Sequence, residues 1–356
     1  MTSIFSLEGR TAVVTGGGRG LGLGISKALL DAGADVVVLS RGGVPDELTA
    51  HAATAGRAVH HYAVDLGDMA AIEDVDRVVR EDRRRDLGRG RAQGARHPAE
   101  GRSRPMTSIF SLEGRTAVVT GGGRGLGLGI SKALLDAGAD VVVLSRGGVP
   151  DELTAYAATA GRAVHHYAVD LGDMAAIEEV AAAVLADHTV DILVNNAGTQ
   201  DRYPAVDFPI DAFDAVLDVN MRAVFRLCQL FGRPMLERGY GKIVNAASLL
   251  TFQGGLNVVA YAASKGAVGQ ITKALCNEWS GKGVNVNAVA PGYMATDMNE
   301  ALLADPVRLE QLSVRIPAGR WGTPEDMGGA VVFLASRASD YVHGQTLAVD
   351  GGWLAR

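Results

Sequence analysis

Apolar residues in the second part of the chain form short β-branched runs separated by segments with helical spacing. Runs such as Asp140–Ser145 (DVVVLS) lack the polar alternation of a half-exposed strand, which is typical of a strand covered on both faces. The predicted strands span 116–120, 140–145, 163–169, 191–195, 242–246, 284–289 and 346–349, and the predicted helices span 125–137, 151–160, 174–187, 210–239, 258–281, 299–313 and 324–336.

Strict alternation of strand and helix with short connections predicts an α/β fold. We expect a doubly wound, Rossmann-like parallel sheet of seven strands flanked by helices. Ligands should then gather at the carboxyl ends of the strands. Pro234 falls inside the helical region at 210–239, where we expect it to break or kink the helix.

Two segments of the chain are nearly identical. Residues 1–75 recur at 106–180 with two differences, His51 against Tyr156 and Asp74 against Glu179. So close a match indicates a recent duplication or an error in gene assembly. The intervening residues 76–105 include ten Arg and five Asp or Glu, a composition that cannot bury enough apolar surface to fold. We expect a partial βαβ fragment at 1–75, an Arg-rich disordered linker at 76–105 and a complete domain at 106–356.

Both copies encode the first three strands, but only one set can join the strand predicted at 191–195. Loop entropy favours the second copy by only roughly 1.6 kcal/mol, at about 0.6 kcal/mol per doubling of the connection. The stronger argument is the helix predicted at 174–187, which continues from the second copy alone. We expect the second copy to build the working site. The first copy should be a tethered, marginal fragment that aggregates or exchanges between subunits.

Composition excludes several classes of protein. The net charge is −6 and aromatic residues make up 5%, which argues against nucleic-acid and membrane partners. An Arg-rich contact of the linker with RNA or DNA is the weaker alternative. Cys228 and Cys276 form no CxxC pattern, so we expect no disulfide framework, no metal site and a cytoplasmic location. No apolar run approaches the length of a membrane span.

A glycine-rich turn follows the strand at 116–120 and opens the next helix. The segment Thr120–Gly127 reads TGGGRGLG. Glycine permits both the sharp turn and the close approach of a pyrophosphate, and the helix N-terminus then presents free N–H groups to it. The alternative to cofactor binding is that the glycines serve only a tight connection between strand and helix. The setting inside a βαβ unit favours dinucleotide binding, and the first copy carries the same turn at Thr15–Gly22.

The end of the second strand bears on cofactor choice. An acidic residue there accepts the ribose hydroxyls of NAD, whereas this chain has Ser145 and Arg146. A guanidinium suits a 2′-phosphate, and Arg124 could add a second positive charge. NADP is therefore favoured over NAD, with solvated arginines as the alternative. Asp170 follows the third strand and is placed either to accept from the adenine amino group or to cap a turn.

Tyr261 and Lys265 lie four residues apart in a predicted helix, which puts them on one face. A free tyrosine has a pKa of about 10, and a unit charge about 4 Å away at an effective dielectric of about 20 contributes roughly 4 kcal/mol, or about three pK units. We therefore expect a lowered phenol pKa. Ser248 ends a strand segment and could hold a substrate oxygen. Asn220, a poor residue for a helix interior, could hold a water near Lys265.

These residues resemble the short-chain dehydrogenase/reductase family over the whole of 106–356. The similarity rests on TGGGRGLG at 120–127, NNAG at 195–198, YAASK at 261–265 and PGYMAT at 291–296, together with Asn220 and Ser248. It implies a catalytic tetrad of Asn220, Ser248, Tyr261 and Lys265, in which Tyr261 is the general acid/base, Lys265 lowers its pKa and binds the nicotinamide ribose, and Ser248 orients the substrate oxygen.

The resemblance also implies a nicotinamide dinucleotide, hydride transfer and a homotetramer, because members of the family are typically tetramers. Thr296 would contact the nicotinamide carboxamide. The candidate cofactor-binding residues are Gly121, Arg124, Gly125, Leu126, Gly127, Ser145, Arg146, Asp170, Leu171, Asn196, Ala197, Gly198, Tyr261, Lys265, Pro291, Gly292 and Thr296.

A narrower similarity lies in the C-terminal half. The segments LLTFQGG at 249–255, IPAGRWG at 316–322 and AVDGGWLAR at 348–356 resemble the 2-deoxy-D-gluconate 3-dehydrogenase and 2-dehydro-3-deoxy-D-gluconate 5-dehydrogenase group. The similarity implies a sugar-acid substrate. Arg202 is the first candidate for its carboxylate, Arg320 a weaker one, and Gln253 a further substrate residue. That group often prefers NAD, so cofactor choice stays open. Reduction of another keto substrate, and a catalytically silent nucleotide-binding sensor or scaffold, are the alternatives.

Overall fold

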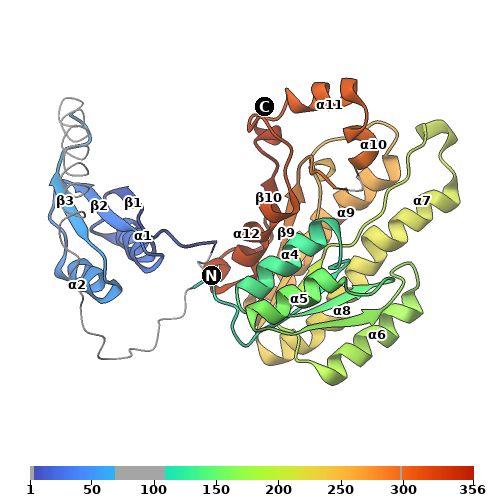
Figure 1. The fold of residues 1–356 in the computed structure, drawn as a ribbon, viewed down its shortest axis with the longest axis horizontal. Coiled ribbons are helices and arrows are strands. Elements are labelled where there is room, and N and C mark those ends of the chain that lie inside the picture. The colour runs from blue at the N-terminus through green and yellow to red at the C-terminus, as the bar shows by residue number, and fades with distance from the viewer. Residues whose placement is uncertain (1–3, 69–108, 297–298) are drawn as a thin grey trace. The chain divides into compact units, whose positions relative to one another are not determined.

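The computed structural model describes residues 4–68, 109–296 and 299–356. Contacts divide the chain into two compact units, Met1–Ser108 and Ile109–Arg356 (Figure 1). Each unit is described by itself below. The predicted linker at 76–105 lies outside the described residues.

The second unit is built on one parallel sheet. Among its described residues, seven strands run in the order β10-β9-β8-β7-β4-β5-β6, and each neighbouring pair is parallel. The strand order reverses between β4 and β7, as in a doubly wound sheet. The predicted fold class is confirmed. The strands are β4 Thr116–Thr120, β5 Asp140–Ser145, β6 Val164–Ala168, β7 Ile192–Asn195, β8 Gly241–Ala246, β9 Val284–Pro291 and β10 Thr346–Val349.

Helices lie on both faces of this sheet (Figure 1). On one side α4 packs against α5 and α12, and on the other α8 packs against α6 and α9. The apolar core between the sheet and the second group includes Leu193, Phe231 and Val268. The helices are α4 Gly125–Asp136, α5 Asp151–Ala160, α6 Met174–Asp187, α7 Ile210–Leu217, α8 Ala223–Arg238, α9 Val259–Trp279, α10 Glu300–Leu303, α11 Pro306–Ser313 and α12 Pro324–Ala335.

The long helical region is interrupted, but not at Pro234. That proline lies within α8, which continues to Arg238, so the helix does not break there, and of the two predicted outcomes only the kink stays a prediction. A proline costs the helix one hydrogen bond and a clash, which the packing of Phe231 and Met235 in the core offsets. The irregularity is instead a π-turn at Asp218–Arg222 between α7 and α8. Such turns insert one extra residue and often coincide with functional sites.

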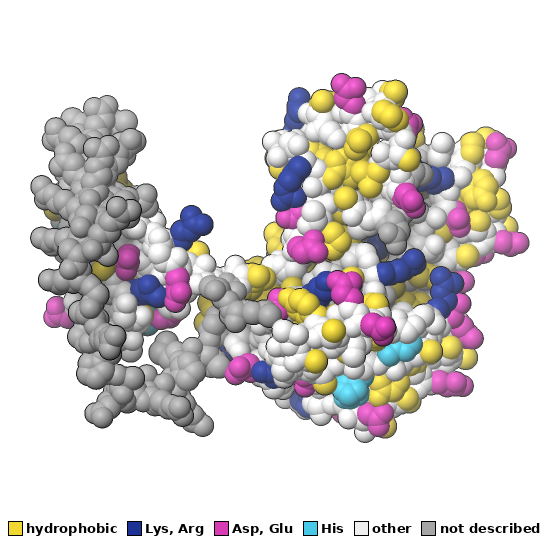
Figure 2. Space-filling model, viewed as in Figure 1, with side chains coloured by type: hydrophobic (Ala, Val, Ile, Leu, Met, Phe, Trp, Pro, Cys, Tyr) yellow, Lys and Arg dark blue, Asp and Glu magenta, His cyan; other side chains and the backbone are white. Residues whose placement is uncertain are grey.

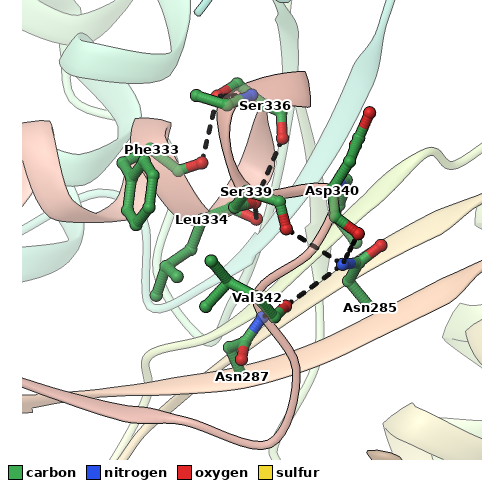
Figure 3. Close-up of polar contacts among 10 residues, drawn as sticks. Asn285, Asn287, Phe333, Leu334, Ser336, Ser339, Asp340 and Val342 are labelled. Carbon is green, nitrogen blue, oxygen red and sulfur yellow. Dashed lines mark hydrogen bonds and ion pairs between the residues drawn. The ribbon is translucent and has the colours of Figure 1, made fainter. Parts of the chain in front are cut away.

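Two asparagines of β9 fix the connection from α12 to β10 (Figure 3). The side-chain amide of Asn285 donates to the carbonyl oxygens of Ser339 and Val342 at 3.1 Å each, and that of Asn287 donates to Val342 at 2.8 Å. Both asparagines are buried. These bonds satisfy backbone groups of an irregular segment that would otherwise be unpaired, and so they hold the last strand in register.

The first unit contains a smaller parallel sheet. Its strands β1 Thr11–Thr15, β2 Asp35–Ser40 and β3 Val59–Ala63 pair in that order, with α1 Gly20–Asp31 and α2 Asp46–Ala55. The second copy, as expected, supplies β4, β5 and β6 of the larger sheet. There β4 has β7 as a second neighbour, whereas β1 is an edge strand.

None of the described helices is both long and apolar enough to span a bilayer. Figure 2 shows basic and acidic side chains interspersed over the visible face of the second unit.

Candidate active site

The glycine-rich turn has the predicted geometry. Gly121 and Gly125 adopt positive φ angles of 64° and 49°, which only glycine tolerates at little cost. A Cβ at Gly127 would overlap the carbonyl oxygen of Gly121. The hydroxyl of Ser131 donates to the carbonyl oxygen of Gly122 at 2.9 Å and ties the turn to α4. The turn thus leaves the N-terminus of a twelve-residue helix open to an anion.

The segment after β7 is tied directly to this turn. The Asn196 side chain donates to the Thr120 carbonyl oxygen at 3.0 Å, and the Ala197 N–H donates to the Thr120 hydroxyl at 2.9 Å. The predicted cofactor residues of the two segments therefore adjoin at the carboxyl edge of the sheet. The structure also brings in Thr296, whose side chain lies 4.0 Å from a Cβ built at Gly125.

The residues predicted to choose the cofactor are accessible. Arg124 and Arg146 are exposed, and neither has an ion pair among the described residues. The Ser145 hydroxyl donates to the carbonyl oxygen of Gly147 at 2.5 Å. The Asp170 carboxylate accepts from the Gly172 N–H at 2.9 Å, so it holds the turn after β6, which was the alternative role considered for it. The neighbouring Leu171 is buried.

Ser248, Tyr261 and Lys265 come together at the end of β8. Ser248 lies two residues beyond β8 and caps the turn Leu249–Thr251, where its side chain accepts from the Leu250 N–H at 3.2 Å. The Lys265 ammonium lies 5.6 Å from the centroid of the Tyr261 ring. It donates to the carbonyl oxygen of Ala246 at 2.6 Å, which anchors α9 to the last residue of β8.

The electrostatics of this cluster differ from the prediction. Burial raises the pKa of the Tyr261 phenol, and a hydrogen bond with Ser248 opposes that shift. Burial also lowers the pKa of Lys265 to about 8. The expectation of a lowered phenol pKa is therefore wrong for this structure. Removal from water penalises the charged forms of both groups and is the largest cause of both shifts.

Asn220 lies in the π-turn and is fully buried. Its side-chain oxygen accepts from the Thr199 N–H and its amide donates to the Thr199 carbonyl, both at 2.8 Å. The amide also donates to the Ser264 hydroxyl at 3.1 Å. Asn220 thus joins the segment after β7 to α9. The sequence analysis assigned no role to Thr199, which follows the NNAG segment, or to Ser264, which lies within YAASK, and it expected a water near Lys265.

A Cβ built at Gly198 would lie 3.2 Å from the side-chain oxygen of Asn220 and 3.6 Å from the Lys265 nitrogen. All four tetrad residues therefore belong to one neighbourhood. Gly292 is equally constrained, because a Cβ there would lie 2.6 Å from the Cα of Asp350. It follows Pro291, the last residue of β9, and brings the C-terminal segment next to the predicted cofactor site.

The candidates for binding a substrate carboxylate differ in whether their side chains already have a partner. Arg202 is exposed and has no ion pair in the described parts of the chain. Arg320 is bound in two places by the Asp326 carboxylate, at 2.6 and 2.8 Å, which lowers the pKa of that acid well below its usual range. Arg320 is therefore not a free cation. Gln253 accepts a hydrogen bond from the Trp353 indole at 3.4 Å.

Several histidine, cysteine and tryptophan side chains have partners that suit a structural role. His165 packs against His188, whereas His166 bonds to Ser145, so the two neighbouring histidines diverge. Cys228 is buried and Cys276 half-buried, and both are free. No group of three or more potential metal ligands gathers among residues 4–68, 109–296 and 299–356. Trp321 and Trp353 both pack in the C-terminal apolar cluster.

Comparison with known proteins identifies the family. A family model described as enoyl-(acyl carrier protein) reductase matches residues 121–354, and the short chain dehydrogenase model matches residues 10–85. The chain belongs to the short-chain dehydrogenase family. The second match falls on the first copy, so the duplicated segment is a fragment of the same family.

Several relatives have names that describe sugar acids. The chain is 51% identical to a 2-dehydro-3-deoxy-D-gluconate 5-dehydrogenase of Bacillus subtilis, over 70% of this chain and 99% of the relative. It is 42% identical to a gluconate 5-dehydrogenase of Gluconobacter oxydans, over 68% and 96%. A crystal structure of a gluconate 5-dehydrogenase from Burkholderia cenocepacia in complex with NADP and tartrate matches with a TM-score of 0.67 and 40% identity, covering 70% of this chain and 99% of that one.

Proposed function

We propose that this protein transfers a hydride between a nicotinamide cofactor and the hydroxyl or keto group of a sugar acid such as 2-deoxy-D-gluconate or 2-dehydro-3-deoxy-D-gluconate. The observation that carries the proposal is the cluster of Ser248, Tyr261 and Lys265 at the carboxyl edge of the sheet, where the glycine-rich turn also lies. The names of the relatives favour a sugar acid.

The residues at this edge fit a dinucleotide. Glycine at positions 121, 125 and 127 leaves the open cradle that a side chain would fill, and the helix N-terminus of α4 faces it with free N–H groups. A bound nicotinamide supplies the hydride. NADP is favoured over NAD by exposed Arg124 and Arg146, and the Burkholderia relative was solved with NADP.

The chain's own residues handle the proton. Because its pKa is raised, the Tyr261 phenol is protonated at neutral pH and can donate its proton to the substrate oxygen during reduction. Ser248 holds that oxygen beside the phenol. Lys265, with a pKa of about 8, is mostly charged at neutral pH and stabilises the phenolate left behind. In oxidation the same proton returns to Tyr261.

We also propose a cytoplasmic homotetramer. Two free cysteines support a reducing compartment. Exposed apolar side chains, Val206 before α7, Ile210 in α7 and Phe225 in α8, support a subunit contact.

Turnover of a panel of keto sugar acids with NADPH and NADH tests the proposal. We expect oxidation of NADPH with at least one of them, and a loss of about 10²–10⁴-fold in kcat for Tyr261→Phe, which keeps the ring and removes the proton. Cofactor binding without turnover of any keto substrate would support the sensor or scaffold alternative instead.

A further inference from the structure

The last residues of the chain form a rigid turn beside the proposed active site. The Asp350 carboxylate accepts from the N–H groups of Gly352 at 2.8 Å and Leu354 at 2.9 Å. The Cα of Asp350 lies against Gly292. This turn therefore fixes Trp353 relative to the segment that follows β9.

Trp353 is almost fully buried, at 3% exposure. The Arg315 guanidinium lies 4.0 Å from the centre of its ring, and the Tyr293 ring lies 4.7 Å away. Two cationic or aromatic partners on a buried indole leave it little freedom to rotate. Its N–H has one partner among the described residues, the side-chain oxygen of Gln253 at 3.4 Å.

Gln253 is connected to catalytic Ser248 through a short capped segment. Ser248 caps the turn Leu249–Thr251, and the backbone N–H of Gln253 donates to the Leu249 carbonyl oxygen at 3.2 Å. Trp353 thus contacts Tyr293, in the segment that follows β9, and Gln253, in the segment that follows Ser248. It links two segments that both carry predicted site residues.

The indole determines which end of the Gln253 amide is free. An indole N–H can only donate, so the amide oxygen must face it and the NH₂ group must point the other way. That NH₂ group has no partner in the described parts of the chain. A half-buried, pre-oriented pair of donors near Ser248 suits the carboxylate or hydroxyl oxygens of a sugar acid.

We propose that Trp353 is a positioning residue that holds the Gln253 amide with its donors toward the acidic substrate, and so sets substrate affinity. This inference rests on the proposed function. It predicts an effect on the KM of the sugar acid, with little effect on kcat or on the KM of the cofactor, because neither residue touches the transferred proton.

The test compares Trp353→Phe with Trp321→Phe in the full chain. Both variants remove an indole N–H and keep an aromatic ring in the same apolar cluster, but the Trp321 indole donates to Ser313 at 3.0 Å. We expect the sugar-acid KM to rise about fivefold in Trp353→Phe, as for the loss of one hydrogen bond, and to stay within twofold in Trp321→Phe. Equal KM values in the two variants, or a fall in kcat with unchanged KM, would overturn the inference.

Gln253→Glu provides a second measurement. The carboxylate can still accept from the Trp353 indole, but it replaces the free donors with a negative charge. We expect a rise in sugar-acid KM larger than that of Trp353→Phe, with an unchanged cofactor KM. A KM equal to that of the wild type would contradict the role of Gln253. Failure of the wild-type chain to turn over any sugar acid would instead overturn the proposed function itself.

Discussion

The two copies of the duplicated segment have the same local structure and different surroundings. Gly16 and Gly121 share a φ of 64°. Ser26 donates to Gly17 at 3.0 Å as Ser131 donates to Gly122 at 2.9 Å. Burial, however, differs sharply: Val13 is 52% exposed in β1, whereas its counterpart Val118 is fully buried in β4.

The helices show the same contrast. Ile25 is 52% exposed in α1, and its counterpart Ile130 in α4 is 1% exposed. A Cβ built at Gly129 would overlap Pro324 of α12, whereas nothing lies within 4 Å of one at Gly24. In the second unit, β7 pairs with β4 and α12 packs on α4, and these contacts bury side chains that are exposed in the first unit. The comparison teaches that the glycine turn and the βαβ pattern are encoded locally, but that the core is completed by residues far along the chain.

The one substitution within the described copies preserves its contact. His51 bonds to Asp31 at 2.7 Å, and Tyr156 bonds to the equivalent Asp136 at 2.8 Å. The copies therefore differ in surroundings rather than in their own bonds. The four residues of the predicted tetrad lie in the second unit, so we expect only its glycine turn to serve the proposed reaction. Paired substitutions at equivalent positions can separate the two.

The largest expected effect comes from the glycine turns. Gly127→Val should abolish activity, by about a thousandfold or more, because its side chain would collide with the Gly121 carbonyl and deform the cradle. Gly22→Val creates the same collision in the first copy and should leave turnover within twofold. Steady-state kinetics of both variants would check this, and equal losses would show that the first copy takes part in the site.

Hydrogen exchange should separate the copies within one peptide. The sequence TAVVTGGG occurs in both copies. The isotope envelope of a peptide with this sequence therefore contains the deuterium uptake of β1 and of β4 together. We expect two populations, with the β1 amides exchanging about 10²-fold faster than those of β4, because an edge strand of a small unit opens more easily. A single envelope throughout the time course would refute a difference in local stability.

Truncation of equivalent valines should give unequal losses of stability. Val118→Ala removes two buried methyl groups and should lower the free energy of unfolding of the second unit by about 2 kcal/mol. Val13→Ala should cost less than about 0.5 kcal/mol, because that side chain is half exposed. Denaturant titration of the two variants measures both values, and similar losses would mean that β1 is covered in solution.

The pH dependence should reflect the second unit alone, since Lys265 has no counterpart in the first copy. Burial lowers its pKa to about 8, so its charge, and with it the reductive kcat/KM, should fall about tenfold between pH 7 and pH 9. Stability should change in the opposite direction. An ammonium whose folded pKa lies below its unfolded value costs stability at low pH, and that cost fades between pH 8 and 10.5. Activity and stability falling together would contradict this assignment.

The smallest effect concerns cofactor choice. Arg146→Asp should reduce the preference for NADPH over NADH, measured as kcat/KM, by about tenfold through loss of a phosphate contact. Arg41→Asp, its twin in the first copy, should leave the preference unchanged. A strong NADPH preference that survives Arg146→Asp would remove Arg146 from the site.

Much of the fold followed from pattern. The β-branched runs gave all seven strands of the second unit to within two residues at each end, because strands buried on both faces have a distinctive composition. The π-turn at Asn220 did not follow, since a single inserted residue leaves no periodic signal. The partners of Asn220, Thr199 and Ser264, are ordinary residues that come together only because the π-turn packs against α9 and the segment after β7.

By itself the sequence determined the glycine turn, the fold class and which residues form the second copy, because these depend on short-range geometry and on the alternation of strands and helices along the chain. Only the tertiary structure decided that Asn220 bonds to Thr199 and Ser264, that burial raises the Tyr261 pKa, and that Arg320 is already paired. These outcomes depend on desolvation and on contacts with residues distant in the chain. Neither can be predicted from a short stretch of sequence.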